Sequence, residues 1–81
     1  MLIALDYDKT YTADPALWDC FVGLARLRGH EVKIVTMRHP HEEVPDTGMD
    51  VVYTSRRAKA AVIKADIWID DSPHWINQDS A

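Results

Sequence analysis

The chain has 81 residues, 47% of them hydrophobic, which allows one small domain spanning residues 1–81 and argues against extensive disorder. Its net charge is −4 and it contains no basic run, which disfavours broad binding to nucleic-acid backbones but leaves a local contact to one phosphate open. Because it has no apolar stretch near the roughly 20 residues of a membrane span, no signal-peptide pattern at its start and a single cysteine, we expect a cytoplasmic protein that stays out of membranes.

The first half of the sequence predicts a strand, a helix and a second strand. The apolar run at residues 2–5 is typical of a short buried strand that ends at Asp6. Asp14 followed by Pro15 predicts a helix start, and Gly29 predicts its end. A strand at 32–36 follows. The buried face of the helix is expected at helical spacing, on Leu17, Cys20, Phe21, Leu24 and Leu27.

The second half predicts a connector, a strand, a helix and a final strand. Two prolines and a glycine make residues 37–50 irregular or limit them to one short helix. Strands are expected at 51–53 and 67–69, and Ser72 with Pro73 predicts one last helical turn. Ser55 is expected to cap a second helix. The buried face of that helix is expected to hold Ala58, Ala61, Val62 and Ala65.

Short apolar strands that alternate with helices predict an α/β fold. We expect a small Rossmann-like three-layer sandwich, in which helices cover both faces of a parallel sheet of about four strands. The connector at 37–50 is long enough for a parallel crossover. Open sheet edges in so short a chain make a homo-oligomer a candidate assembly.

Polar residues that could take part in catalysis or ligand binding follow each predicted strand at the point where it ends. They are Asp6 and Asp8 after the first, Thr36 at the end of the second, Lys59 after the third, and Asp70 and Asp71 after the fourth. Because the carboxyl ends of parallel strands share one edge of the sheet, where ligands bind, these side chains should gather there.

Four carboxylates at one edge require a positive partner. Two unit charges about 4 Å apart repel by roughly 4 kcal/mol at an effective dielectric constant near 20. Such a cluster either takes up protons or binds a cation, and hard oxygen ligands favour Mg²⁺. A bound phosphate would add charge that Mg²⁺ and Lys59 offset, which points to phosphoryl transfer.

The same residues form four ordered motifs. Residues 6–10 read Asp-Tyr-Asp-Lys-Thr, Thr36 ends an Ile-Val-Thr run, Lys59 follows two arginines, and Asp70 and Asp71 follow an isoleucine. Over residues 2–73 this order resembles the haloacid dehalogenase-type phosphatases, whose first motif is DxDxT. The resemblance implies a magnesium-dependent phosphatase without a cap domain, since neither residues 10–14 nor residues 37–50 have room for one.

The resemblance also implies a role for each motif residue. Asp6 would attack phosphorus and form an aspartyl-phosphate, while Asp8 would protonate the leaving group and then activate water. Thr36 would hydrogen-bond a phosphoryl oxygen, and Lys59 would neutralise the charge of Asp6 and the phosphoryl group. The implied Mg²⁺ ligands are Asp6, the backbone carbonyl of Asp8, Asp70, and Asp71 through water or as an orienting group. Thr10 would fix the loop that carries Asp8.

Several points stay open in the sequence. Many family members have glycine where Lys9 stands, so this lysine either lies near the phosphate or is simply solvated. Arg56 or Lys64 could replace Lys59, and Arg38 with His39 could contact substrate. The substrate could be a nucleotide, a nucleic-acid end or another phosphorylated metabolite. An uncapped site favours a large substrate, or a cap supplied by another subunit.

Two other classes compete with the phosphatase. The first is a phosphatase-like module that binds Mg²⁺ or phosphate without useful turnover, although a pure binder does not need Asp8. The second is a receiver domain, which we reject because there the acidic pair follows the first strand and the phospho-accepting aspartate follows the third. The spacing of the histidines fits no structural zinc site. Core packing or a subunit interface is the expected role of Trp18, Trp68 and Trp75.

Overall fold

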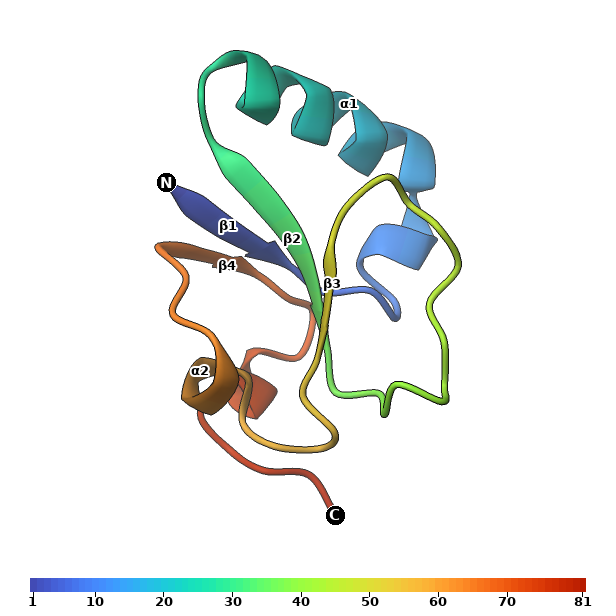
Figure 1. Ribbon diagram of the computed structural model, residues 1–81, viewed down its shortest axis with the longest axis vertical. Coiled ribbons are helices and arrows are strands. Elements are labelled where there is room, and N and C mark those ends of the chain that lie inside the picture. Colours follow the sequence, from blue (N-terminus) through green and yellow to red (C-terminus); the bar gives the residue numbers. More distant parts are fainter.

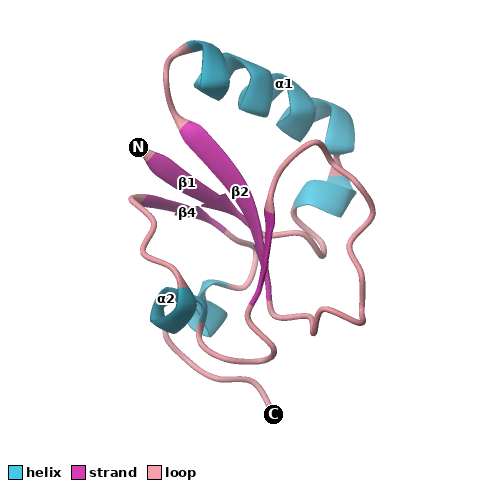
Figure 2. Ribbon diagram, viewed as in Figure 1, coloured by secondary structure: helices cyan, strands magenta, loops and turns pink.

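A computed structural model describes all 81 residues of the chain and confirms the expected α/β fold class. In chain order the elements are β1 (Leu2–Leu5), a 3₁₀ helix (Tyr11–Ala13), α1 (Pro15–Leu27), β2 (Glu31–Thr36), β3 (Val51–Tyr53), α2 (Lys59–Val62), β4 (Ile67–Ile69) and a second 3₁₀ helix (Pro73–Ile76). The sheet lies between α1 and the much shorter α2 (Figure 1, Figure 2). None of the helices is long and apolar enough to span a membrane.

The four strands form one parallel sheet in the order β3-β2-β1-β4. Leu5, at the end of β1, pairs with Ile34 of β2 on one side and Ile69 of β4 on the other. The chain runs outward from β1 through β2 to β3 and then crosses back to place β4 beside β1. The strand order therefore reverses between β1 and β4, which is the position where open parallel sheets bind ligands.

Both ends of α1 are those that the sequence predicts. The carboxylate of Asp14 accepts a hydrogen bond from the Leu17 N–H at 3.2 Å, which satisfies one free donor of the first turn. At the other end Gly29 has a φ of 84°, a left-handed conformation that glycine adopts without steric cost. The His30 N–H then donates to the Ala25 carbonyl at 2.9 Å and closes the helix as a Schellman motif.

The predicted buried face of α1 is wrong. Four of its five expected members are exposed: Leu17 (55%), Cys20, Leu24 (61%) and Leu27 (82%). The helix instead buries Val22 and Ala25, and Trp18 and Phe21 pack partly against the same core. These four residues form a second apolar stripe at helical spacing.

We expect the two stripes to differ in their contribution to stability. Val22→Ala should lower the free energy of unfolding by about 2 kcal/mol, because it removes methyl groups from a side chain that is only 5% exposed. Leu24→Ala should change it by less than about 0.5 kcal/mol, because Leu24 is 61% exposed. Urea unfolding of both variants makes the comparison, and an equal loss would mean that the leucine stripe is covered.

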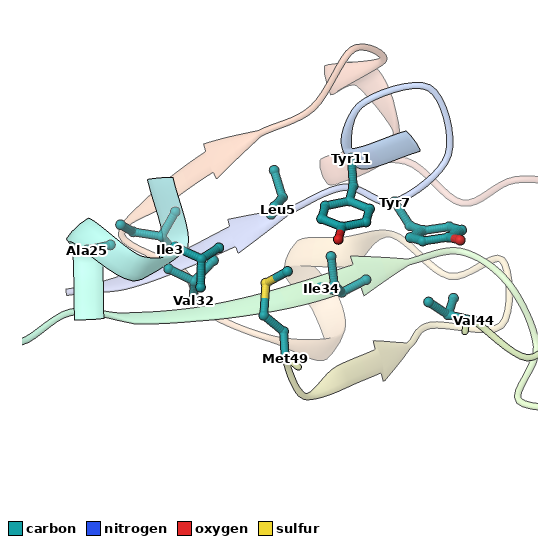
Figure 3. Close-up of a cluster of buried hydrophobic side chains, with 10 residues drawn as sticks. Ile3, Leu5, Tyr7, Tyr11, Ala25, Val32, Ile34, Val44 and Met49 are labelled. Atoms are coloured by element: carbon teal, nitrogen blue, oxygen red, sulfur yellow. The ribbon is translucent and has the colours of Figure 1, made fainter. Parts of the chain in front are cut away.

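The core lies between α1, the sheet and the connector at 37–50 (Figure 3). The connector is irregular, which was one of its two expected forms. Its residues Val44 and Met49 are 5% and 7% exposed and pack in the same cluster as Leu5 and Ile34. The Val44 N–H donates to the Tyr53 hydroxyl at 2.9 Å, which ties the connector to β3. The connector thus serves as part of the fold, and its start borders the carboxyl edge of the sheet.

The second helix is shorter than predicted, and Ser55 does not cap it. Ser55 and Arg56 have φ values of 53° and 69°, so they form a left-handed turn, and α2 contains only four residues from Lys59 to Val62. Of its predicted buried face only Ala58 is buried, since Ala61 and Val62 are exposed and Ala65 lies beyond the helix. After this turn α2 starts at Lys59, whose side chain is only 3% exposed and pairs with Asp6.

Candidate functional site

One cavity of about 220 Å³ opens at the carboxyl edge of the sheet, where the strand order reverses. The Asp6 N–H donates to the Ile69 carbonyl at 2.9 Å and so holds the ends of β1 and β4 side by side. The cavity is lined by Asp6, Asp8, Lys9, Thr36, Met37, Arg38, Arg56, Lys59, Asp70, Asp71, Ser72, Trp75 and Ser80. All six motif residues that the sequence singles out therefore lie around the same space.

Lys59 joins the two strand ends electrostatically. Its ammonium lies 2.8 Å from a carboxylate oxygen of Asp6 and 2.6 Å from one of Asp70. All three side chains are largely buried, with exposed fractions of 3% for Lys59, 11% for Asp6 and 3% for Asp70. Buried ions require such pairing, because an isolated buried charge is strongly unfavourable. Arg56 and Lys64, the alternatives that the sequence left open, do not pair with these carboxylates.

Thr10 links Asp6 to Asp71 beside the cavity. Its hydroxyl lies 3.1 Å from an oxygen of Asp6 and 2.9 Å from one of Asp71, and it accepts a hydrogen bond from the Asp71 N–H at 3.2 Å. A hydroxyl has one proton to donate, so it can satisfy only one of the two carboxylates at a time. The fixed position of Thr10 holds the loop after β1 against the residues that follow β4.

Burial and mutual repulsion set the protonation of this group in the absence of metal. Burial raises the pKa of Asp6 to about 6, although Lys59 opposes the change, and hydrogen bonding with Asp71 raises it further. The hydrogen bond with Asp6, followed by the one with Thr10, holds the pKa of Asp71 below its usual value. Below about pH 6 a proton is therefore held by Asp6 in preference to Asp71.

We expect Asp6 to titrate near pH 6 in the metal-free protein, which carboxyl ¹³C NMR measures directly. An unfolded aspartate ionises near 3.8, so the contribution of Asp6 to stability is present below that pH and is lost as the pH rises to about 6. Adding Mg²⁺ should move the Asp6 carboxyl resonance at pH 6 away from its half-titrated position, because a cation and a proton compete for the carboxylate. A metal-free midpoint at the ordinary aspartate value would contradict this description.

Asp8 is held apart from the other carboxylates by Arg38. The guanidinium donates two hydrogen bonds to the Asp8 carboxylate, at 3.0 Å and 2.7 Å, in the fork geometry that arginine forms with carboxylates. It also lies over the Tyr7 ring, 5.1 Å from the centroid, and donates to the Glu42 carbonyl at 3.3 Å. Arg38 is therefore fixed by contacts on several sides. It lines the cavity, where it could contact substrate as the sequence suggested.

A second arginine reaches the cavity edge from the turn before α2. The Arg56 guanidinium lies 3.2 Å from the Glu42 carboxylate, which also accepts the His39 N–H at 2.9 Å. The backbone N–H groups of Ser55 and Arg56 donate to carbonyls of residues 38 and 37, so the turn and the connector are bound together. His39 itself is not among the residues that line the cavity.

The donor set fits a hard divalent cation. Asp6, Asp70 and Asp71 each place a carboxylate oxygen within 4.8 Å of the others. Oxygen donors of this kind suit Mg²⁺, which commonly combines a few carboxylates with water and phosphate oxygens. The Asp8 carboxylate is not in this group, since it pairs with Arg38. A metal contact from Asp8 would therefore use its backbone carbonyl, as the resemblance implies.

Some functional candidates could not be read from the sequence. Trp75, expected in the core or an interface, is partly exposed and lines the cavity together with Ser72 and Ser80. Nothing in the residues around it indicated this position, because the path of the chain after β4 depends on tertiary contacts. Thr36, in contrast, lies where its strand ends, is only 2% exposed, and its hydroxyl accepts the Arg38 N–H at 3.3 Å.

No family model matches the chain, and no curated protein or solved structure is detectably similar to it. Its function must therefore be inferred from the residues around the cavity and the chemistry that they allow.

Proposed function

We propose that the protein is a magnesium-dependent phosphohydrolase that works through an aspartyl-phosphate on Asp6, in the manner of the haloacid dehalogenase-type phosphatases. The observation that carries the proposal is the arrangement of Asp6 between the Lys59 ammonium at 2.8 Å and the two other carboxylates of the cation site. A nucleophilic carboxylate needs positive charge around it when it meets a phosphate, and this arrangement supplies the lysine and a cation site together.

The residues that would hold Mg²⁺ are Asp6, Asp70 and Asp71, together with the Asp8 carbonyl. When bound, the ion would neutralise charge on the phosphoryl oxygens and orient the group toward Asp6. The pairing of Lys59 with both Asp6 and Asp70 leaves it next to the position of the transferred group. Thr36, at the end of β2, offers a hydroxyl at the same edge for a phosphoryl oxygen.

Two displacements at phosphorus make up the proposed reaction. In the first, an Asp6 oxygen forms a bond to phosphorus while the bond to the leaving oxygen breaks, and that oxygen receives the proton of Asp8. In the second, Asp8 accepts a proton from water, whose oxygen attacks phosphorus and releases phosphate from Asp6. Asp6 must be ionised for the first step; with a pKa of about 6 this form predominates above that pH, and bound Mg²⁺ would favour it further.

Hydrolysis of p-nitrophenyl phosphate, with Mg²⁺ and with EDTA, tests this proposal. We expect Mg²⁺-dependent turnover by the native protein and a loss of at least about a thousandfold in Asp6→Asn. Asp50→Asn is the matched control, because Asp50 is exposed and its carboxylate has no hydrogen-bond partner. Turnover that survives EDTA, or that Asp6→Asn retains, would refute the proposal.

A binding module for Mg²⁺ or phosphate is the second candidate, and the pairing of Asp8 with Arg38 favours it. The Asp8 carboxylate accepts two hydrogen bonds from the Arg38 guanidinium, at 3.0 Å and 2.7 Å, so both of its oxygens are engaged in an ion pair and neither is free to meet a leaving group. This candidate gains support if calorimetry detects Mg²⁺ binding that Asp70→Asn weakens while no phosphate ester is hydrolysed.

A further inference from the structure

Lys9 has a backbone conformation that its side chain does not favour. Its φ is 68°, in the left-handed region that residues other than glycine, asparagine and aspartate rarely occupy. Its N–H donates to the Thr12 hydroxyl at 2.9 Å, so the turn after Asp8 fixes this conformation. Residues held in such conformations concentrate at functional sites, where the surrounding structure holds them against the strain. The side chain of Lys9 is therefore the place to look for a role.

Lys9 is also the cation of the cavity whose charge is not already paired. Four cationic side chains line the space, and three of them have carboxylate partners within 4.0 Å: Lys59 with Asp6 and Asp70, Arg38 with Asp8, and Arg56 with Glu42. The Lys9 ammonium has no ion-pair or hydrogen-bond partner, and its charge acts only at longer range on Asp71, whose pKa it helps to lower. In the proposed reaction Mg²⁺ and Lys59 offset the charge of the transferred phosphoryl group. The charge of Lys9 is then left for another anion.

The position of Lys9 shows where that anion would lie. Lys9, Asp70 and Asp71 line both the main cavity and an adjoining groove of about 370 Å³, which continues along Ala13 and Trp18. A substrate whose phosphoryl group sits against Asp6 and whose remainder extends into this groove passes the residues that line both spaces, of which Lys9 is the only cation. Lys9 is therefore the cation available to the part of the substrate that lies next to the transferred group.

We propose that Lys9 binds a second anionic group of the substrate, so that the site prefers phosphomonoesters that carry another phosphate nearby. This proposal rests on the phosphohydrolase function proposed above. The second phosphate can belong to a small bisphosphate or to the diester next to the terminal phosphate of a strand. Both present the same chemistry to the lysine, a phosphate oxygen that accepts a charge-assisted hydrogen bond.

The test compares kcat/KM for substrates with and without the second phosphate. The substrates are adenosine 3′-monophosphate and 5′-monophosphate, adenosine 3′,5′-bisphosphate, and a 3′-phosphorylated dinucleotide that represents a strand end. For the native protein we expect the bisphosphate or the dinucleotide to exceed the better monophosphate by about fivefold, the scale of one partly exposed ion pair. A preference for the bisphosphate alone identifies a small substrate, and one for the dinucleotide alone identifies a strand end.

Three substitutions separate charge from backbone strain. Lys9→Asn removes the charge but tolerates the left-handed conformation, and it should abolish the fivefold preference, whereas Lys9→Arg should keep it. Lys9→Gly should abolish the preference while raising Tm by about 4 °C, because the strain is relieved. Lys64→Asn, which removes an exposed lysine that lines no cavity, should keep both the preference and Tm. A preference that survives in Lys9→Asn, or one that is also lost in Lys64→Asn, would overturn the proposal.

Failure of the phosphohydrolase function can be told apart from failure of this proposal. If no substrate is turned over, calorimetry with Mg²⁺ still measures how native protein and Lys9→Asn bind adenosine 3′,5′-bisphosphate and adenosine 5′-monophosphate. A fivefold preference for the bisphosphate that Lys9→Asn loses supports the role of Lys9 in a binding module. Equal affinities in the native protein would refute it.

Discussion

Lys59→Met should lower the free energy of unfolding by about 3–5 kcal/mol, the largest loss of stability that we expect from a single substitution in this chain. The substitution keeps the length of the side chain but leaves Asp6 and Asp70 as buried carboxylates without their common cation. A domain of this size has a total stability of about 4–12 kcal/mol, so a large part of it would be lost. Urea unfolding in EDTA measures the effect.

Mg²⁺ should restore part of the stability of Lys59→Met, since a bound cation replaces the missing positive charge among the three carboxylates. If the variant does not fold in EDTA, adding Asp6→Asn to it should recover folding, because one buried charge is then removed. Lys64→Met is the matched control, since Lys64 is exposed and forms no ion pair. A loss no greater than that of Lys64→Met would show that the buried ion pairs do not hold the site together.

Asp8→Asn should reduce hydrolysis of an alkyl phosphate by about 10²–10⁴-fold, the usual contribution of a general acid and base. For p-nitrophenyl phosphate the loss in the first step should be smaller, because nitrophenolate leaves without needing a proton. The Asp8 side chain is 52% exposed, so the fold should tolerate the change. Pre-steady-state release of nitrophenol, compared with that of an alcohol, separates the two cases.

Two further variants show whether the effect belongs to Asp8 as a proton donor. Asp8→Glu, which keeps the carboxyl group, should retain part of the alkyl phosphate activity. Arg38→Gln tests the resting ion pair, because it removes the two hydrogen bonds to Asp8 without removing the acid. An identical loss for aryl and alkyl phosphates in Asp8→Asn would mean that Asp8 does not protonate the leaving group.

The sequence was sufficient for the strands and for the gathering of the motif residues at one edge. Leu2–Leu5, Val51–Tyr53 and Ile67–Ile69 are short apolar runs that end at polar residues, so their limits are visible in the residues themselves. A parallel sheet then brings their carboxyl ends together whatever the details of the helices. Asp14 and Gly29 determine the ends of α1 through local hydrogen bonds and backbone conformation, which also need no tertiary information.

The helix faces could not be predicted in the same way. α1 carries two apolar stripes, and the larger one, which contains Leu24 and Leu27, is the one that faces outward. Helical periodicity identifies both stripes but not which of them the sheet accepts, because that choice depends on how closely the helix approaches the strands. The left-handed turn at Ser55 and Arg56 contains no glycine, so nothing in the sequence signalled it and α2 was expected to be longer.

The electrostatic partners depend on long-range geometry for the same reason. Arg38 and Asp8 are separated by 30 residues, and their pairing requires that β1 and β2 be adjacent and in register. The Glu42–Arg56 pair additionally requires the irregular connector to fold back toward the turn before α2. Sequence reasoning could nominate Arg38 because it follows Thr36, but it could not assign its partner.

The most direct test is to look for a phosphoryl group on Asp6. The Asp8→Asn variant, which should slow release of the covalent intermediate, is mixed with p-nitrophenyl phosphate and Mg²⁺, quenched with acid and measured by intact-protein and peptide mass spectrometry. We expect a mass increase of one phosphoryl group that maps to the peptide containing Asp6, and none in EDTA or in Asp6→Asn. Nitrophenol release in the first turnover without any such adduct, or an adduct on another residue, would contradict Asp6 as the nucleophile.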